Sequence, residues 1–309
     1  MNVLVVGGSG FIGTALCEEL KARGHTVTAL SRNPGTAGLP SGVEKAIGDV
    51  RAYDSIRSSF DGKDVVVNLV ALSPLFKPSG GLSHREVHLQ GTENVVEAAT
   101  DAGVGRIVQM SALGADPGGP TEYIRTKGEA ERVVRDSGLG YTVFRPSVVF
   151  GDGGEFVPFT KKLAPRPVAP MPGGGETKFQ PVWVGDLVPM LADAVENEDS
   201  AHTDAVYEIG GPEVLTLAEV TEMAYDAEGK SITLLPMPMS MADIGLSLLG
   251  AVGGPMGPDQ ARSLRMDNVV AENDIEAFGV ERGDLTTLGQ YLGLEAWDRA
   301  AAGEDTAAA

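Results

Sequence analysis

The sequence predicts an α/β protein built on a doubly wound parallel sheet, with a small C-terminal α/β part. Apolar segments alternate with helical patterns over residues 1–150, as expected when helices connect parallel strands and cover both faces of the sheet. A glycine-rich segment follows the first apolar run directly. Residues 65–71 are almost entirely apolar, which is typical of a strand buried on both faces.

The first 32 residues predict a strand, a glycine loop, a helix and a second strand. Gly8, Gly10 and Gly13 match the pattern G-x-G-x-x-G between residues 3–6 and a helical segment, a context that indicates a Rossmann dinucleotide site. The alternative is a tight turn without a ligand. The amides of the loop and the positive end of the helix would bind a pyrophosphate. The predicted contacts are Gly7, Gly8, Ser9, Gly10, Phe11, Ile12 and Gly13.

The end of the second strand favours NADP(H) over NAD(H), although NAD(H) stays possible. An acidic residue there would bind the ribose 2′-hydroxyl of NAD, but residues 26–30 lead into Ser31 and Arg32. Arg32 could pair with a 2′-phosphate, or it is a solvated charge at a strand end. Asp49 and Val50 follow the next short strand and are candidate adenine contacts, although an Asp before a helix is also a common N-cap.

The later elements complete the predicted core. Apolar patterns indicate strands at residues 65–71, 106–111 and 141–146, and helices at 84–102 and 122–137. Residues 151–181 are rich in Pro and Gly and predict an irregular loop; a helix at 186–197, a strand near 206–211 and a helix at 216–228 follow. We therefore expect a Rossmann core over 1–150, an interleaved substrate or lid part over 151–299, and a disordered tail over 300–309.

Composition narrows the class of protein. The net charge of −19 argues against nucleic acid as a partner, and together with the few lysines it favours a salt-loving source; an ordinary acidic protein is the alternative. The single cysteine, Cys17, excludes an internal disulfide. The first strand begins at the N-terminus and no apolar run reaches about 18 residues, so we expect a cytoplasmic protein without a membrane span.

A second motif indicates chemistry. Tyr123 and Lys127 lie four residues apart on a predicted helix and therefore share a face. A nearby ammonium would lower the pKa of the phenol and suit it to proton transfer with a carbonyl or alcohol. Ser111 ends the preceding strand and could bond the reacting oxygen. The alternative is a solvated helix face, because this spacing is common by chance.

These residues resemble the extended and atypical short-chain dehydrogenase/reductase families. The glycine loop, Asp49, Ser111, Tyr123 and Lys127 occur in the expected order. The sequence is still more similar to a subgroup that resembles the NAD(P)H-binding accessory subunit of mitochondrial complex I. That similarity covers about residues 1–295 and is carried by residues 123–127, 144–151, 180–186, 207–212 and 259–268.

The resemblance implies that Tyr123 is the acid/base, Lys127 its activator and a ribose ligand, and Ser111 the group that orients the carbonyl. It also implies cofactor contacts at Gly7, Gly10, Gly13, Arg32, Ala71 and Pro146, with Ser147 beside the nicotinamide. His88 stands where many members have an Asn of the proton relay; it either replaces that Asn or serves packing. Members of the subgroup often bind nucleotide without demonstrated turnover.

The resulting expectation is an NADP(H)-binding oxidoreductase that acts on a carbonyl, alcohol or quinone-type substrate. The alternatives are a nucleotide-sugar epimerase or dehydratase, and a non-catalytic sensor or respiratory-complex assembly or accessory subunit. Residues 237–256 are apolar and rich in methionine, so they form a lid over a hydrophobic substrate, a membrane-surface contact or a packed helix. The four histidines show no metal-ligand spacing, and we expect no metal.

Overall fold

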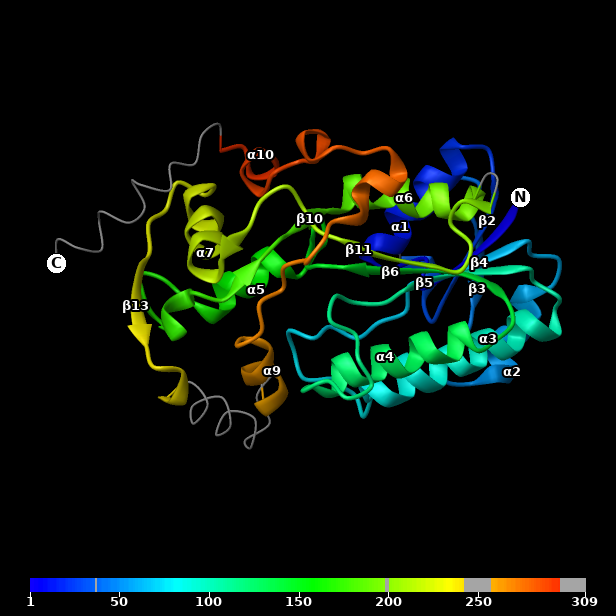
Figure 1. Ribbon diagram of the computed structural model, residues 1–309, viewed down its shortest axis with the longest axis horizontal. Coiled ribbons are helices and arrows are strands. Elements are labelled where there is room, and N and C mark those ends of the chain that lie inside the picture. Colours follow the sequence, from blue (N-terminus) through cyan, green and yellow to red (C-terminus); the bar gives the residue numbers. More distant parts are fainter. Residues whose placement is uncertain (37, 198–199, 242–256, 295–309) are drawn as a thin grey trace.

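The computed structural model describes residues 1–36, 38–197, 200–241 and 257–294. Within these residues the central sheet has seven strands, all parallel, in the order β11-β6-β5-β4-β1-β2-β3 (Figure 1). The strands are β1 (Asn2–Val6), β2 (Thr26–Ser31), β3 (Glu44–Ile47), β4 (Val65–Asn68), β5 (Arg106–Met110), β6 (Gly140–Pro146) and β11 (Ala205–Ile209). The predicted doubly wound Rossmann fold is confirmed.

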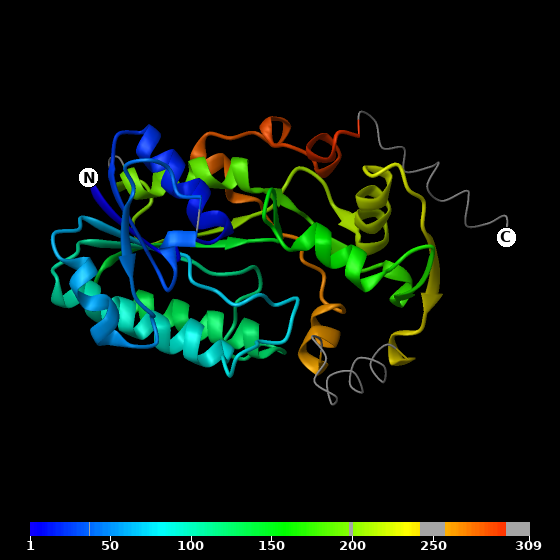
Figure 2. The same cartoon turned by 180° about the vertical axis from the view of Figure 1, so that it is seen from behind.

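Helices cover both faces of this sheet, as the two opposite views show (Figures 1 and 2). One face carries α1 (Phe11–Ala22) and α6 (Val184–Glu196), and the other carries α2 (Tyr53–Ile56), α3 (Gly91–Asp101) and α4 (Glu122–Arg135). Side chains of β1 alternate between the two cores: Val3 and Val5 pack on the α1/α6 side, whereas Leu4 and Val6 pack on the α3 side. This alternation explains the continuous apolar run that predicted the strand.

The segment predicted as an irregular loop over residues 151–181 is largely regular. It contains α5 (Phe156–Leu163), β8 (Val168–Pro172) and β9 (Lys178–Phe179). Two of the prolines that suggested a loop, Pro170 and Pro172, lie in β8. This strand belongs to a two-stranded sheet with β13 (Thr233–Met237), and such a strand tolerates residues without an N–H. The buried rings of Phe156 and Phe159 fix α5 in a separate apolar core with α7 (Leu217–Asp226).

Chain segments beyond residue 151 also complete the central layer. β11 pairs with β6, and α6 packs against α1, where Arg23 forms ion pairs with Asp193 at 2.5 Å and Glu196 at 2.8 Å. The remaining elements are β7 (Val149–Phe150), β10 (Val182–Trp183), β12 (Leu215–Thr216), α9 (Pro258–Ser263) and α10 (Leu288–Leu292), with 3-10 turns at Pro34–Thr36, Arg57–Phe60, Gly173–Gly175, Asp274–Phe278 and Arg282–Asp284. The predicted tail at 300–309 and most of segment 237–256 lie outside the described residues.

Two predicted elements differ near the site. The strand expected over residues 65–71 ends at Asn68, so Ala71 lies in the loop after β4. The helix expected over 84–102 begins as a π-helix, Arg85–Gln90, and becomes α-helical only at Gly91. π-Helical turns are rare and concentrate at functional sites, because they shift the side chains that follow.

Candidate functional site

The glycine loop between β1 and α1 is packed too closely for side chains at two positions. A Cβ atom on Gly13 would lie 2.3 Å from the carbonyl oxygen of Gly7, and one on Gly8 would lie 2.7 Å from the Cβ atom of Ala29. Gly7 has φ +85° and donates its N–H to the carbonyl oxygen of Leu30 over 2.8 Å. Glycine at these positions therefore lets α1 begin directly against the loop.

The first turn of α1 offers backbone N–H groups to an anion. The N-cap residue is Gly10, which has no side chain to accept the N–H groups of the first turn, and that turn contains no acidic residue. The first helical hydrogen bond runs from the N–H of Thr14 to the carbonyl oxygen of Gly10. The N–H groups of Phe11, Ile12 and Gly13 therefore have no acceptor within the helix, and the half-buried Ser9 lies just before them. With the helix dipole, these groups fit the pyrophosphate of a dinucleotide.

A pocket of about 90 Å³ lies beyond the carboxyl ends of β1, β2, β3 and β4. Apolar side chains form most of its wall, and polar groups gather at the end of β2. The lining residues are Val6, Leu30, Ser31, Arg32, Gly48, Asp49, Val50, Arg51, Val70, Ala71, Leu72 and Val87. The structure thus brings together five predicted cofactor residues, Ser31, Arg32, Asp49, Val50 and Ala71, in one pocket next to the glycine loop.

The polar end of this pocket fits the ribose of an adenine dinucleotide. The Oγ atom of Ser31 is buried and has no hydrogen-bond partner within the described chain. An unpaired buried hydroxyl costs about 1–3 kcal/mol, which a ligand that bonds it would recover. Arg32 is exposed beside it and forms no ion pair with another described residue. The donor set therefore suits a hydroxyl or phosphate at the 2′ position.

Arg51 is a pocket residue that the sequence analysis missed. Its guanidinium binds the carboxylate of Asp49, with 2.6 Å between Nη2 and Oδ2. This bond, with a smaller contribution from Arg32, holds the pKa of Asp49 below its ordinary value. The only available signal was its position two residues after Asp49, which does not distinguish it from a solvated surface arginine.

Tyr123 and Lys127 lie on one face of α4, as their spacing predicts. Thr121 caps this helix by accepting the N–H of Ile124 over 3.2 Å. Lys127 is 1% exposed and donates from Nζ to the carbonyl oxygen of Met110, at the end of β5, over 3.0 Å. Burial lowers the pKa of Lys127 to about 8.

The expectation that Lys127 lowers the pKa of Tyr123 is wrong for this structure. Burial raises the pKa of the Tyr123 phenol, and no opposing charge effect offsets it. The physical reason is that Lys127 is directed to the backbone of β5. Proton transfer at Tyr123 therefore requires additional stabilisation of the phenolate by a bound ligand or a rearranged lysine.

Ser111 faces a buried ionic cluster. Its hydroxyl donates to Oε1 of Glu131 over 2.5 Å, and Glu131 is also bound by Arg145, with 2.7 Å between Nη2 and Oε2. Glu131 lies one helical turn after Lys127 and is 3% exposed. The serine predicted to orient a carbonyl thus lies at the end of β5 beside α4, with its proton committed to a carboxylate.

His88 connects the loop after β4 to α4. Its Nε2 accepts the N–H of Leu72 over 2.9 Å, so this nitrogen carries no proton, and Nδ1 lies 3.1 Å from Oγ1 of Thr126. The Thr126 hydroxyl donates to the carbonyl oxygen of Glu122 over 2.9 Å, which leaves Nδ1–H as the donor to Thr126. His88 is thus neutral, and burial holds its pKa far below the ordinary range.

The ring of His88 also packs against Tyr123, with 5.3 Å between ring centroids, and His84 packs against the same tyrosine at 5.6 Å. His84 is 2% exposed, and its Nδ1 has no hydrogen-bond partner among the described residues. His84, which caps the π-helix, and His88, which lies within it, therefore form the wall that holds the Tyr123 ring.

Pro146 and Ser147 lie where β6 ends. Pro146 accepts the N–H of Leu113 over 3.0 Å, and the Ser147 hydroxyl donates to the carbonyl oxygen of Gln180. These contacts hold the end of β6 against the loop after β5, so both residues lie on the same edge of the sheet as Ser111.

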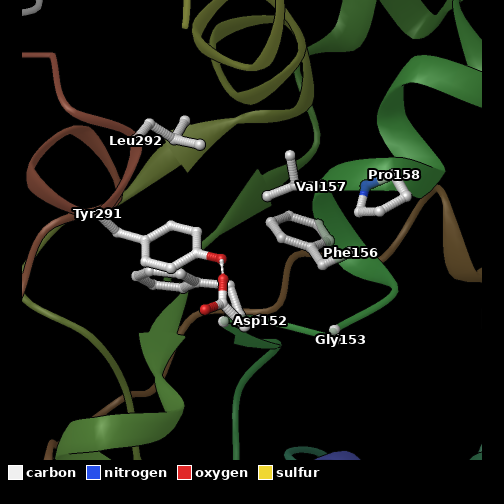
Figure 3. A pocket seen from close by; sticks show the side chains of 10 residues that line it. Asp152, Gly153, Phe156, Val157, Pro158, Tyr291 and Leu292 are labelled. Atoms are coloured by element: carbon white, nitrogen blue, oxygen red, sulfur yellow. Dashed lines mark hydrogen bonds between the residues drawn. The ribbon is translucent and has the colours of Figure 1, made fainter.

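A larger cavity, of about 240 Å³, lies between the loop after β7, α5 and α10 (Figure 3). Aromatic side chains form much of its wall, and the hydroxyl of Tyr291 donates to Asp152 over 2.7 Å. Its lining residues are Phe150, Gly151, Asp152, Gly153, Gly154, Phe156, Val157, Pro158, Tyr291 and Leu292. None of them belongs to the predicted cofactor or catalytic set.

The part of the chain that the structure describes lacks two kinds of feature. Its residues contain no group of three or more His, Cys, Asp or Glu side chains arranged to hold a metal ion. They also contain no helix with the length and apolar character needed to cross a membrane.

Known proteins resemble this chain in fold and in sequence. The UDP-glucose 4-epimerase of Thermotoga maritima, in complex with UDP-glucose, superposes with a TM-score of 0.70 at 20% identity, over 95% of this chain and 97% of that one, and shows the fold. The chain is 28% identical to the NADH dehydrogenase [ubiquinone] 1 alpha subcomplex subunit 9 of Arabidopsis thaliana, over 88% of this chain and 71% of that protein. It is also 28% identical to the 2-alkyl-3-oxoalkanoate reductase of Stenotrophomonas maltophilia, over 74% and 76%.

These similarities confirm the predicted resemblance to extended short-chain dehydrogenase/reductases and to accessory subunits of complex I. A family model described as NAD(P)H-binding matches residues 7–162, which is half of the chain and includes Gly7 to Gly13 of the glycine loop, Asp49, Tyr123 and Lys127. This chain therefore belongs to the NAD(P)H-binding family.

Proposed function

We propose that this chain is an NADP(H)-dependent reductase that converts a carbonyl group to an alcohol. The bound nicotinamide would supply the hydride. The chain's own residues would hold the dinucleotide, orient the substrate oxygen and deliver a proton to it.

The observation that carries this proposal is the shared face of α4 that holds the half-buried Tyr123 and the buried Lys127. Their spacing puts both side chains on one side of α4, and the amine of Lys127 reaches the end of β5, at the sheet edge where ligands of such folds bind. A lysine with a pKa near 8 can exchange its proton around neutral pH, which suits a group that supports proton transfer.

In this proposal Tyr123 gives its proton to the substrate oxygen. Lys127, released from Met110, binds the nicotinamide ribose and stabilises the phenolate. Ser111 orients the substrate oxygen once its hydroxyl exchanges Glu131 for the substrate. Pro146 and Ser147 lie beside the nicotinamide.

The preference for NADP(H) rests on Ser31 and Arg32. Among the described residues, the buried hydroxyl of Ser31 at the end of β2 has no hydrogen-bond partner and the guanidinium of Arg32 after it has no ion-pair partner. The sequence offers no carboxylate there for a ribose 2′-hydroxyl. A 2′-phosphate would satisfy both groups.

The proposed activity is tested by following NADPH oxidation with a panel of ketones, β-keto acids and quinones. Tyr123→Phe should lower kcat/KM by about 100-fold or more, because it removes the proton donor while keeping the ring. Tyr141→Phe, on β6, is the matched control and should keep the wild-type rate. Equal rates for the wild type and Tyr123→Phe would contradict the proposal.

A non-catalytic nucleotide-binding accessory subunit is the second candidate. It is supported by the similarity to the plant complex I subunit and by the bond that commits Ser111 to Glu131. Tight NADPH binding without turnover on any substrate of the panel would favour this candidate.

A further inference from the structure

The pocket for the adenosine end contains one carboxylate among its lining residues, that of Asp49. A carboxylate at this place is unfavourable for a 2′-phosphate, which carries about −1.5 to −2 charges at neutral pH. The net charge of the chain, −19, also disfavours the binding of a further anionic group. The affinity for a 2′-phosphate therefore depends on whether a cation neutralises the carboxylate of Asp49.

The carboxylate of Asp49 is bound on two sides by Arg51. The guanidinium donates from Nη2 to Oδ2 over 2.6 Å and from Nε to Oδ1 over 3.1 Å, and the backbone N–H of Arg51 donates to Oδ1 over 3.0 Å. Such a two-point pair fixes the orientation of both groups. Asp49 is thus neutralised by a residue two positions away.

The backbone around this pair is also fixed. Ser55 accepts the N–H of Asp49 over 3.0 Å and donates to its carbonyl oxygen over 2.9 Å. The side chain of Asn94, on α3, donates to the carbonyl oxygen of Val50 over 2.6 Å. Asp49 therefore keeps its place in the pocket wall, and the bond from Arg51 decides how much of its charge a ligand experiences.

We propose that Arg51 determines the acceptance of a 2′-phosphate by neutralising Asp49, while Arg32 makes the direct contact with the phosphate. This inference rests on the proposed NADP(H) preference. Arg51 is a positioning residue in this account, because it acts on the ligand through the carboxylate and not through a contact of its own.

The test uses 2′,5′-ADP and 5′-AMP, which differ only in the 2′-phosphate, and measures their Kd by calorimetry with the full chain. Arg51→Ala should weaken the binding of 2′,5′-ADP by about tenfold or more and that of 5′-AMP by less than about threefold, since only 2′,5′-ADP places a 2′-phosphate beside the uncovered carboxylate. The double variant Asp49→Asn/Arg51→Ala should restore the Kd of 2′,5′-ADP to within about threefold of the wild type.

Arg57→Ala is the matched control. Arg57 forms an ion pair with Asp54 and not with Asp49, and its side chain is 61% exposed. Equal thermal midpoints of all variants would show that each is folded. An Arg51→Ala protein with unchanged affinities would overturn the inference, and so would a loss that Asp49→Asn fails to rescue, which would indicate direct contact.

The failure of the proposed cofactor preference is a separate result. In that case the wild type itself binds 2′,5′-ADP no more tightly than 5′-AMP, and both the NADP(H) preference and the role of Arg51 are overturned. A wild-type preference that persists in Arg51→Ala overturns the role of Arg51 alone.

Discussion

The hydroxyl of Ser111 donates to the carboxylate of Glu131 over 2.5 Å, one helical turn beyond Lys127. Glu131 in turn binds Arg145, which reaches Glu208 on β11 over 3.3 Å. The face of α4 that carries Lys127 thus continues into an ionic cluster around the buried Glu131, which ties the helix to β6 and β11. The cluster places a charge next to the site without exposing it to solvent.

Glu131→Gln should destabilise the protein, because it leaves the guanidinium of Arg145 without its buried partner. The expected loss in the free energy of unfolding is about 3 kcal/mol. Glu129→Gln on the same helix is the control: its pair with Arg85 is exposed, so the loss should stay below about 1 kcal/mol. Urea unfolding at neutral pH measures both, and equal losses would contradict the assigned burial.

His88 should make the protein less stable as the pH falls. Its folded-state pKa lies below the ordinary value of about 6.5, so below that pH the unfolded chain binds a proton that the folded protein does not. Stability is fully present above about pH 6.5 and falls by about 1.4 kcal/mol per pH unit below it.

The corresponding experiment compares the wild type with His88→Asn by urea unfolding between about pH 7.5 and 5.5. The variant should show the shallower loss. Glu222, whose pKa burial raises to about 7, acts in the opposite direction but equally in both proteins. Parallel curves for the two proteins would mean that the pKa of His88 is not lowered by folding, because the group would then bind its proton equally in both states.

Gly13→Ala should abolish tight dinucleotide binding. The new Cβ atom would lie 2.3 Å from the carbonyl oxygen of Gly7, so the loop or the first turn of α1 must move. Gly105→Ala, where a Cβ atom meets nothing within 4 Å, is the control. NADPH titration by fluorescence measures both, and wild-type affinity in Gly13→Ala would exclude this loop as the pyrophosphate site.

Arg32→Ala should reduce the affinity for NADPH by about tenfold while leaving that for NADH nearly unchanged, because only NADPH carries the 2′-phosphate. NADH is the internal control within each protein. A similar loss for both nucleotides would assign Arg32 a general structural role.

The sequence was sufficient for the central fold because local patterns reflect it directly. The glycine loop follows a buried strand, and the spacing of Tyr123 and Lys127 needs only helical periodicity. The segment over residues 151–181 misled because prolines that suggest a loop also occur in the strand β8. The halophilic source, the cytoplasmic location and the domain boundaries stay predictions.

The directions of polar side chains could not be predicted, since they depend on partners distant in the sequence. Ser111 turns to Glu131, and His88 bonds Leu72 and Thr126. Which partner each side chain bonds depends on the packing between β5, α4 and the loop after β4. Spacing places the residues close together but does not determine which of them bond.

The most direct test of the account is a parallel titration of the wild-type chain with NADPH and NADH by calorimetry in the same buffer. The account predicts that NADPH binds at least about tenfold more tightly, through the 2′-phosphate contacts of Ser31 and Arg32. Equal affinities, tighter binding of NADH, or no binding of either nucleotide would contradict it.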